Sequence, residues 1–396
     1  MIISKKVRLL PTLEQETKMR QSAGTARFIY NWTLHKEMDN YKNGGKFIPD
    51  GKLRKEITQL KKGPLSWLKE VSNNVAKQAV KDCCNAYKKF FAMPKRFSDK
   101  VIKKAKRQNR ELTFYDLEGH PKLKSKKRNK PSFYNDPIKL KVKNKTVLLE
   151  KIGWVKISES LPSVKYSNPR VTFDGKYWYI SVGIEIEPSK VELTDKSLGI
   201  DLGIKDLAIC SDGKVFKNIN KTFRIKKLKK RLKRLHKQIS RKYEKNKIEK
   251  GGSCQFIKTK NIEKLENKMR LLYRKLTNIR DNYIHQITTS IVKTKPYRIV
   301  IENLDIKSMM KNKYKAPLIQ EQKWHKFRQY IAYKAEKNGI EFVLAERFFP
   351  SSKTCSCCGS YKSNLKETDR TYICDQCGLI IDRDSNASLN LSNYNI

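Results

Sequence analysis

Two cysteine pairs near the C-terminal end constrain the fold more than any other feature of this sequence. Cys355-x-x-Cys358 and Cys374-x-x-Cys377 are separated by 15 residues, and a glycine follows each pair directly. Each pair can form a tight turn whose thiolates point at one ion, and two such turns complete a tetrahedral zinc site. Four thiolates leave no open coordination position, so the spacing predicts one structural Zn²⁺ ion. Redox-active thiols are the alternative.

The distribution of the cysteines also bears on the cellular compartment. Five of the nine cysteines lie within residues 355–377. This crowding favours metal binding in a reducing compartment over a secreted disulfide framework. We therefore expect a cytoplasmic protein. Cys357 could exchange with a neighbouring ligand, but the spacing favours Cys355 and Cys358.

The charge balance indicates the class of partner. The 396 residues include 88 Lys and Arg against 39 Asp and Glu, a formal net charge of +49. Repulsion on this scale opposes a compact state unless a polyanion neutralises it. Hydrophobic residues make up 38% of the chain, which excludes a disordered basic tail. No apolar stretch approaches 18 residues, so we expect no membrane span. A nucleic-acid-binding protein is the prediction, with a basic membrane-surface protein as the weaker alternative.

The first half of the chain combines helical and strand patterns. Residues 1–10 are typical of a strand that Pro11 ends, and Thr12 with Gln15 forms a predicted capping box. Helical spacing recurs from about residue 72 to residue 91. Short strands are then predicted, the last two around an Asp174-Gly175 hairpin turn: residues 138–143, 146–151, 155–158, 170–173 and 177–187. We expect a small β-barrel that the preceding helices interrupt.

The second half begins near Leu193 and has a different pattern. Two amphipathic helices joined at Gly251-Gly252 are expected to form an antiparallel hairpin. Around them we predict strands at residues 196–202, 206–210, 214–217, 297–303 and 340–345, a helix at 319–338 and a short terminal helix near residue 384. The order β-β-β-α-β-α-β-α is that of an RNase H-like fold, a mixed sheet flanked by helices. The predicted class is therefore α+β with several domains.

Three carboxylates occupy positions that favour a metal site. Asp201 stands between two glycines of a predicted strand, Glu302 ends an apolar strand, and Asp384 begins the last helix. Taken singly, they could be a solvent-facing aspartate, an acid with an internal partner, and a helix N-cap. Together on an RNase H-like order, they form the three-carboxylate arrangement that holds two Mg²⁺ ions for phosphodiester hydrolysis.

Seven motifs make the chain resemble the TnpB family, transposon-encoded RNA-guided DNA endonucleases related to compact type V CRISPR effectors. They extend from residue 8 to about residue 391: RLLPTLEQ, GTARFIYN, GIDLGIKDLA, VIENL, FFPSSKTCSCCG, CDQCG and DRDSNAS. The resemblance implies a catalytic triad of Asp201, Glu302 and Asp384, with zinc on Cys355, Cys358, Cys374 and Cys377. Ser388 replaces an alanine that is common in the family, a change outside the triad.

The resemblance also implies a domain organisation. A wedge domain of oligonucleotide-binding-barrel type takes its first strand from residues 1–11 and the rest from residues 96–192, with a helical recognition domain inserted at residues 12–95. A RuvC-like nuclease domain covers residues 193–348, a zinc-ribbon target-nucleic-acid-binding domain covers residues 349–380, and residues 381–396 return to the nuclease domain.

Basic segments are the expected nucleic-acid contacts. Residues 224–250 hold 14 Lys and Arg against 2 Glu, a charge excess that favours a phosphate track over a solvated helix. The predicted contacts there are Lys229, Lys230, Lys233 and Arg234. A basic loop adds Lys124, Lys126, Lys127 and Arg128. The resemblance implies Arg27, Tyr30 and Asn31 near guide RNA and DNA, and Lys77 and Gln78 near the motif flanking the target. Tyr30 could instead be a core residue.

The predicted function is that of an RNA-guided, Mg²⁺-dependent endonuclease encoded by an insertion sequence. Guide RNA from the transposon end selects double-stranded DNA by base pairing, the protein binds a short flanking motif, and a single RuvC-like site cuts. One protein copy per guide is expected. The alternatives are an RNA-guided DNA-binding regulator without cleavage and an accessory transposase of the element.

Overall fold

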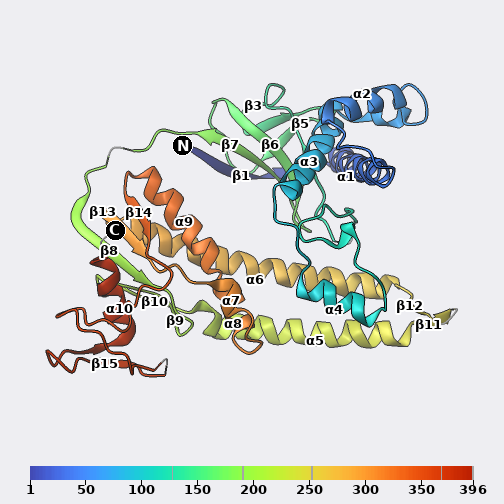
Figure 1. The fold of residues 1–396 in the computed structure, drawn as a ribbon. Coiled ribbons are helices and arrows are strands. Elements are labelled where there is room, and N and C mark those ends of the chain that lie inside the picture. The colour runs from blue at the N-terminus through green and yellow to red at the C-terminus, as the bar shows by residue number, and fades with distance from the viewer. Residues whose placement is uncertain (127, 190, 251–252, 367, 395–396) are drawn as a thin grey trace. The chain divides into compact units, whose positions relative to one another are not determined.

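The computed structural model describes the chain except residues 127, 190, 251–252, 367 and 395–396, and except the side chains of residues 249, 250 and 253. The chain forms two compact units (Figure 1). Ile2–Glu185 make up the N-terminal unit, and Ile186–Ile396 with Met1 make up the C-terminal unit. None of the described helices is long and apolar enough to cross a membrane.

The N-terminal unit is built on a seven-stranded sheet with the order β2-β6-β7-β1-β5-β4-β3. Its strands are β1 (Ile2–Leu10), β2 (Ser132–Tyr134), β3 (Lys141–Lys143), β4 (Thr146–Leu149), β5 (Gly153–Ile157), β6 (Tyr166–Phe173) and β7 (Trp178–Glu185). β1 pairs antiparallel with β7 from Ile2↔Glu185 to Leu9↔Trp178. The first strand of the chain therefore lies inside a sheet whose other strands follow the predicted insertion of helices. The described strands pair as a sheet with β2 and β3 at its edges, so their pairing does not close the predicted barrel.

The inserted helices are α1 (Leu13–Lys42), α2 (Asp50–Leu60), α3 (Asn73–Phe91) and α4 (Asp99–Arg107), with short 3₁₀ turns η1 (Ser66–Glu70) and η2 (Phe114–Asp116). The predicted capping box is present, because Thr12 and Gln15 each accept a hydrogen bond from the other's backbone amide, at 3.3 and 3.1 Å. The predicted hairpin is also present, since Gly175 has φ +98° between β6 and β7.

The C-terminal unit contains a five-stranded sheet with the order β10-β9-β8-β13-β14. Its strands are β8 (Thr194–Asp201), β9 (Asp206–Cys210), β10 (Val215–Lys217), β13 (Pro296–Ile301) and β14 (Glu341–Leu344). β13 is parallel to both β8 and β14, whereas β9 is antiparallel to β8 and β10. The carboxyl ends of β8, β13 and β14 consequently meet at one edge of the sheet.

Two long helices, α5 (Phe223–Lys245) and α6 (Lys260–Val292), lie side by side (Figure 1). They are antiparallel, because His236 is bonded to Tyr273 at 2.7 Å and Tyr243 to Glu266 at 2.8 Å. The predicted junction at Gly251-Gly252 lies outside the described residues. The other elements are η3 (Ile219–Lys221), β11 (Lys247–Lys250), β12 (Ser253–Phe256), α7 (Ile306–Met309), α8 (Ala316–Gln322), α9 (Trp324–Lys337), β15 (Thr371–Ile373), β16 (Ile380–Asp382) and α10 (Arg383–Ser392).

The single helix predicted over residues 319–338 is wrong. Lys323 adopts a left-handed conformation, with φ +54°, and separates α8 from α9. Its ammonium group is 2.5 Å from Asp281 on α6, and the adjacent Gln322 and Trp324 are each 3% exposed. Tertiary contacts therefore break a helix in which no glycine or proline marks the break.

The two faces of the five-stranded sheet are covered by different helices. Ile200 of β8 and Ile301 of β13 are fully buried in a core with Ile291 of α6 and Phe327 of α9. Val300 points to the opposite face, where it packs with Leu391 of α10. Successive strand residues alternate between faces. The side chains of Asp201 and Glu302 are therefore directed to the α10 face.

Candidate catalytic and metal sites

Asp201 and Glu302 lie side by side at the carboxyl edge of the sheet. β8 and β13 are parallel with Ile200 opposite Ile301, so the next residue of each strand is an acid at the same level. Neighbouring strands are about 4.8 Å apart. Two carboxylates that are 101 positions apart in the sequence are therefore neighbours on one face of the sheet.

Asp384 belongs to the first turn of α10 and does not cap it. Asp382 is the N-cap, since its Oδ1 accepts the amides of Asp384 and Ser385, both at 3.0 Å. The alternative that Asp384 is a plain N-cap is therefore wrong, because the helix starts at Arg383, one residue before the predicted position. Asp382 ends β16 and satisfies the helix terminus, which leaves the carboxylate of Asp384 available for another role.

A glycine brings α10 into direct contact with β8. A Cβ atom on Gly199 would lie 2.0 Å from the carbonyl oxygen of Ser388 and 2.3 Å from the amide nitrogen of Ser392. Ser388 is one helical turn after Asp384, and Asp201 is two residues after Gly199 on its strand. Residues so spaced share a face of their helix or strand, so this approach directs Asp384 toward Asp201. Ser388 donates to the carbonyl of Ser385 at 2.8 Å, and its hydroxyl therefore keeps a partner.

The electrostatics of the site show three acids acting on one another. Burial raises the pKa of Asp201 well above its usual range, and the Glu302 and Asp384 carboxylates raise it further. Burial, followed by Asp384, raises the pKa of Glu302 to about 7. The guanidinium of Arg383 donates to Asp384 at 3.0 and 3.2 Å, and Arg370 lies 3.6 Å from it. Carboxylate oxygens are the ligands that Mg²⁺ prefers, so these acids have the chemistry of a divalent-cation site, although among the described residues only the four cysteines place their ligand atoms within 4.8 Å of one another.

The four predicted zinc ligands come together. Their Sγ atoms all lie within 4.8 Å of one another, with 3.6 Å between Cys355 and Cys377 and 3.5 Å between Cys358 and Cys374. A tetrahedron with Zn–S bonds of about 2.3 Å has edges of about 3.8 Å, whereas a disulfide requires about 2.05 Å. The four-cysteine cluster therefore fits a zinc ion, and Cys357 is not part of it.

Both cysteine pairs have the same backbone geometry. Gly359 and Gly378 have φ +74° and +71° and donate their amides to the carbonyls of Cys355 and Cys374, at 3.0 and 3.1 Å. The left-handed conformation is open to glycine at little cost. This explains why a glycine follows each pair.

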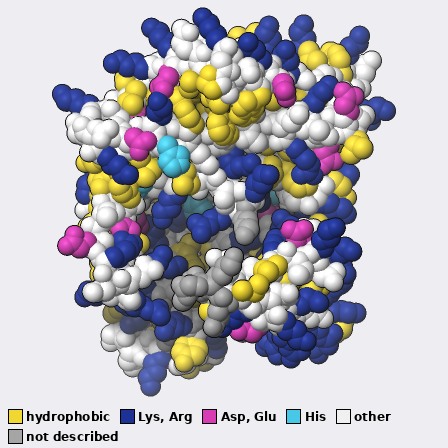
Figure 2. Space-filling model, turned by 90° about the vertical axis from the view of Figure 1, so that its right-hand side faces the viewer, with side chains coloured by type: hydrophobic (Ala, Val, Ile, Leu, Met, Phe, Trp, Pro, Cys, Tyr) yellow, Lys and Arg dark blue, Asp and Glu magenta, His cyan; other side chains and the backbone are white. Residues whose placement is uncertain are grey.

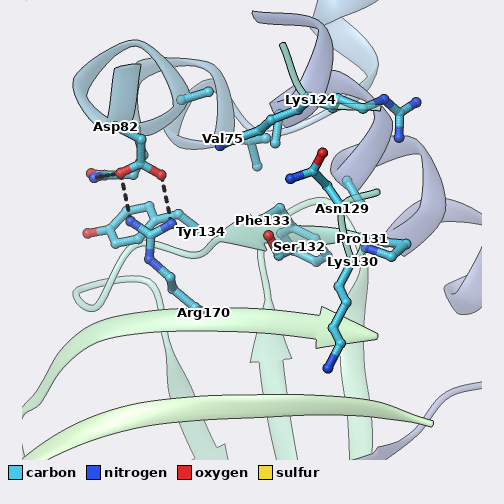
Figure 3. A pocket seen from close by; sticks show the side chains of 15 residues that line it. Val75, Asp82, Lys124, Asn129, Lys130, Pro131, Ser132, Phe133, Tyr134 and Arg170 are labelled. Carbon is cyan, nitrogen blue, oxygen red and sulfur yellow. Dashed lines mark hydrogen bonds and ion pairs between the residues drawn. The ribbon is translucent and has the colours of Figure 1, made fainter. Parts of the chain in front are cut away.

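In the N-terminal unit, a pocket collects several predicted nucleic-acid contacts (Figure 3). Arg27, Gln78 and Lys124 are among its lining residues, and its empty volume is about 510 Å³. Figure 3 shows Arg170 extended toward Asp82, which accepts two hydrogen bonds of 2.7 Å from it. Gln78 donates to the same carboxylate at 2.9 Å. The sequence analysis missed the Asp82–Arg170 pair, since its partners are 88 positions apart and have no local motif.

Tyr30 and Asn31 both contact Lys124. Asn31 exchanges hydrogen bonds with the backbone of Lys124, at 2.9 and 2.8 Å, and the Lys124 ammonium lies 3.5 Å from the centre of the Tyr30 ring. Tyr30 is 6% exposed, and burial raises its pKa to about 12. Tyr30 is therefore a core residue, the alternative considered above. Lys77, Lys126 and Arg128 are exposed, and Lys127 lies outside the described residues.

The basic helix α5 presents most of its predicted contacts to solvent. Lys230, Lys233 and Arg234 are exposed and have no ion-pair partner within the part of the chain that the structure describes. Lys229 differs, because its ammonium is 2.5 Å from Glu321, which Arg280 also contacts at 3.2 Å. Lys229 therefore already has a partner within the described part of the protein, unlike the other three predicted phosphate contacts of α5. Figure 2 shows Lys and Arg side chains spread over the visible face with few acids among them.

Three family models match successive parts of the chain. They are a helix-turn-helix domain of OrfB/IS605 proteins at residues 1–46, a "Probable transposase" model of the same group at residues 180–313, and a Cas12f1-like TNB domain at residues 324–391. InsQ of Escherichia coli K12, named as a candidate RNA-guided DNA endonuclease, is 29% identical over 98% of this chain and 90% of its own length. The chain is therefore similar to the TnpB family along nearly its whole length. The resemblance stated from the motifs is thus confirmed.

Further relatives agree with this similarity. A Streptomyces pristinaespiralis protein, also named as a candidate RNA-guided DNA endonuclease, is 28% identical over 98% of this chain and 87% of its own. Among solved structures, a Cas12f1 chain from a complex with single-guide RNA and target DNA has TM-score 0.56 at 14% identity, covering 99% of both chains. The Cas_phi3 endonuclease has TM-score 0.51 at 9% identity, covering 99% and 92%. The α+β fold is that of compact Cas12 effectors.

Proposed function

We propose that this protein is an RNA-guided endonuclease that cuts double-stranded DNA next to a short flanking motif. The observation that carries the proposal is the meeting of Asp201, Glu302 and Asp384 at one edge of the sheet, in a chain related to candidate RNA-guided DNA endonucleases. The strand order and directions of the C-terminal sheet support an RNase H-like, RuvC-type nuclease domain. The pairing of β1 with β7 supports a wedge domain with an inserted helical domain.

The proposed domain boundaries are those expected from the motifs. The wedge comprises residues 1–11 and 96–192, the recognition domain residues 12–95, and the nuclease domain residues 193–348 and 381–396. The zinc ribbon at residues 349–380 is inserted before the terminal helix, and its four cysteines hold one structural zinc ion. This ion would take no part in the chemistry, since all four coordination positions are filled by sulfur.

In the proposed mechanism, Asp201, Glu302 and Asp384 would hold two Mg²⁺ ions. Magnesium bound there supplies charge stabilisation for the attacking water and the leaving oxygen of an in-line displacement. The chain contributes the geometry, because strand register fixes Asp201 beside Glu302 and Gly199 fixes the approach of α10. Arg370, half exposed and 3.6 Å from Asp384, is placed to bind a phosphate oxygen as the substrate enters.

The basic surfaces are the proposed contacts for guide RNA and target DNA, with one protein copy per guide. Neutralising phosphates with Lys and Arg releases counterions, so the binding should weaken steeply as salt rises. We assign this role to side chains that are exposed or line the pocket of Figure 3: Arg27, Lys77, Gln78, Lys124, Lys126, Arg128, Lys230, Lys233 and Arg234.

The test is cleavage directed by the RNA that the protein itself retains. The protein is purified with its bound RNA, the RNA is sequenced, and DNA matching its guide segment is offered in a library of flanking sequences. We expect cleavage of matched DNA only, in the presence of Mg²⁺, and loss of cleavage in Asp201→Ala. Asp212→Ala, an acid in the exposed turn after β9, is the matched control. Specific binding without cutting would favour the regulator instead.

A further inference from the structure

The terminal helix α10 is bound to the first zinc-binding turn as well as to the sheet. Asn386 is fully buried, its amide donates to the carbonyl of Thr354 at 2.7 Å, and its side-chain oxygen accepts the Ser356 amide at 2.9 Å. Asn390, one helical turn later, donates to the carbonyls of Ser351 and Thr354, both at 2.6 Å. Four hydrogen bonds thus join α10 to the backbone on both sides of Cys355.

The same helix carries Asp384, less than one turn before Asn386. A helix moves as a unit over so short a distance because its hydrogen bonds fix successive turns. The close approach of Gly199 to Ser388 leaves α10 no space to shift toward β8. The position of Asp384 relative to Asp201 is therefore set by two contacts, the sheet on one side and the zinc-binding turn on the other.

The zinc-binding turn in turn depends on its metal. Cys355 and Cys377 belong to different pairs, and their sulfur atoms are 3.6 Å apart. Coordination of both sulfurs to one zinc ion would hold them at this distance. In structural zinc sites, metal binding energy is largely folding energy. Loss of zinc would thus release the backbone that Asn386 and Asn390 bind, and with it the constraint on Asp384.

We propose that α10 couples the two metal sites, with Asn386 and Asn390 as positioning residues. Zinc in the four-cysteine site raises the affinity of the Asp201, Glu302 and Asp384 site for Mg²⁺, and bound Mg²⁺ raises the affinity of the four-cysteine site for zinc. The second effect follows from the first, because coupling between two binding sites is reciprocal. The inference rests on the proposed magnesium site. Zinc occupancy then controls cleavage although zinc is absent from the chemistry.

The experiment measures the equilibrium partition of zinc between the full-length protein and a chromogenic chelator that binds Mg²⁺ weakly. Saturating Mg²⁺ should protect zinc in the wild type by raising the affinity of the protein for zinc on the order of tenfold. Asn386→Ala and Asp384→Ala should abolish this protection. Asn390→Ala should reduce it, because Thr354 keeps its bond from Asn386. Asn393→Ala removes an exposed asparagine that ends the same helix, and it should behave like the wild type.

A second readout separates positioning from a general structural role. Cleavage by Asn386→Ala should require on the order of tenfold more Mg²⁺ for half its maximal rate and should recover at high Mg²⁺. Circular dichroism and a starting content of one zinc per chain establish that each variant is folded. If Asn386→Ala does not fold, Asn390→Ala provides the milder change.

The outcomes for the coupling and for the proposed function are distinct. A wild type that cuts guide-matched DNA but has the same affinity for zinc with and without Mg²⁺ overturns the coupling alone. Equal protection in the wild type and Asn386→Ala also overturns it. A wild type that does not cut, yet shows protection that Asp384→Ala removes, overturns the nuclease and supports the coupling.

Discussion

Replacement of Gly199 by alanine should move Asp384 away from Asp201 while keeping all three of the proposed catalytic acids in the sequence. The new methyl group would lie 2.0 Å from the Ser388 carbonyl oxygen and 2.3 Å from the Ser392 amide nitrogen. Both are backbone atoms, so no side chain can rotate away. Relieving the first overlap requires α10 to move by about 1 Å or more, and displacements of about 1 Å at a catalytic group can cost about a hundredfold in rate.

We therefore expect Gly199→Ala to lower the single-turnover rate of matched DNA cleavage about a hundredfold. Overpacking of a close contact typically costs about 1–3 kcal/mol of stability, so the variant should remain folded. Its affinity for guide RNA and matched DNA should be unchanged, because Gly199 is buried against α10. Both affinities are measured by filter binding with Mg²⁺ replaced by Ca²⁺.

The matched control is Gly51→Ala, since a Cβ atom on Gly51 meets no other atom within 4 Å. This glycine lies in the first turn of α2, where alanine is favoured over glycine, so cleavage and stability should be preserved. Cleavage by Gly199→Ala within threefold of the wild type would refute the argument that the approach of α10 to β8 sets the position of Asp384.

Three further predictions follow from the same geometry. Asp384→Ala should reduce the rate of single-turnover cleavage on the order of a thousandfold with target binding retained. Asp382→Ala removes an N-cap, so it should cost about 1 kcal/mol of stability and lower the cleavage rate by only a small factor. If Asp382→Ala lowers the rate more than Asp384→Ala does, the third acid is Asp382. Cys374→Ser should lose its zinc and destabilise the C-terminal unit, and one zinc per chain with full activity would contradict the four-cysteine site. Because the pKa of Glu302 is raised from 4.5 to about 7, the folded state binds more protons than the unfolded state in that interval, so magnesium-free protein should lose stability as pH rises from about 4.5 to 7; thermal unfolding of Glu302→Gln should lack this part of the slope, and an unchanged slope would count against the buried acid.

Several features of the molecule could be predicted from local sequence because their physical causes are local. The Cys-x-x-Cys pairs with their glycines, the Thr12 capping box and the Asp174-Gly175 hairpin each depend on interactions within a few residues. Alternation along β8 likewise placed Asp201 on the face opposite Ile200 before any partner was known. The motifs then indicated the family, which the comparisons confirmed.

Other features depend on which faces meet, and local spacing does not encode this. The helix break at Lys323 depends on the ion pair of Lys323 with Asp281 on another helix. The ion pair that occupies Lys229 depends on Glu321, which is 92 positions away. The clamp of Asn386 on Thr354 and the contact of Gly199 with Ser388 join segments distant in the sequence. Sequence periodicity determined which residues share a face, and only tertiary packing decided that α10 covers β8, because that choice is set by the fit of backbone to backbone at a glycine.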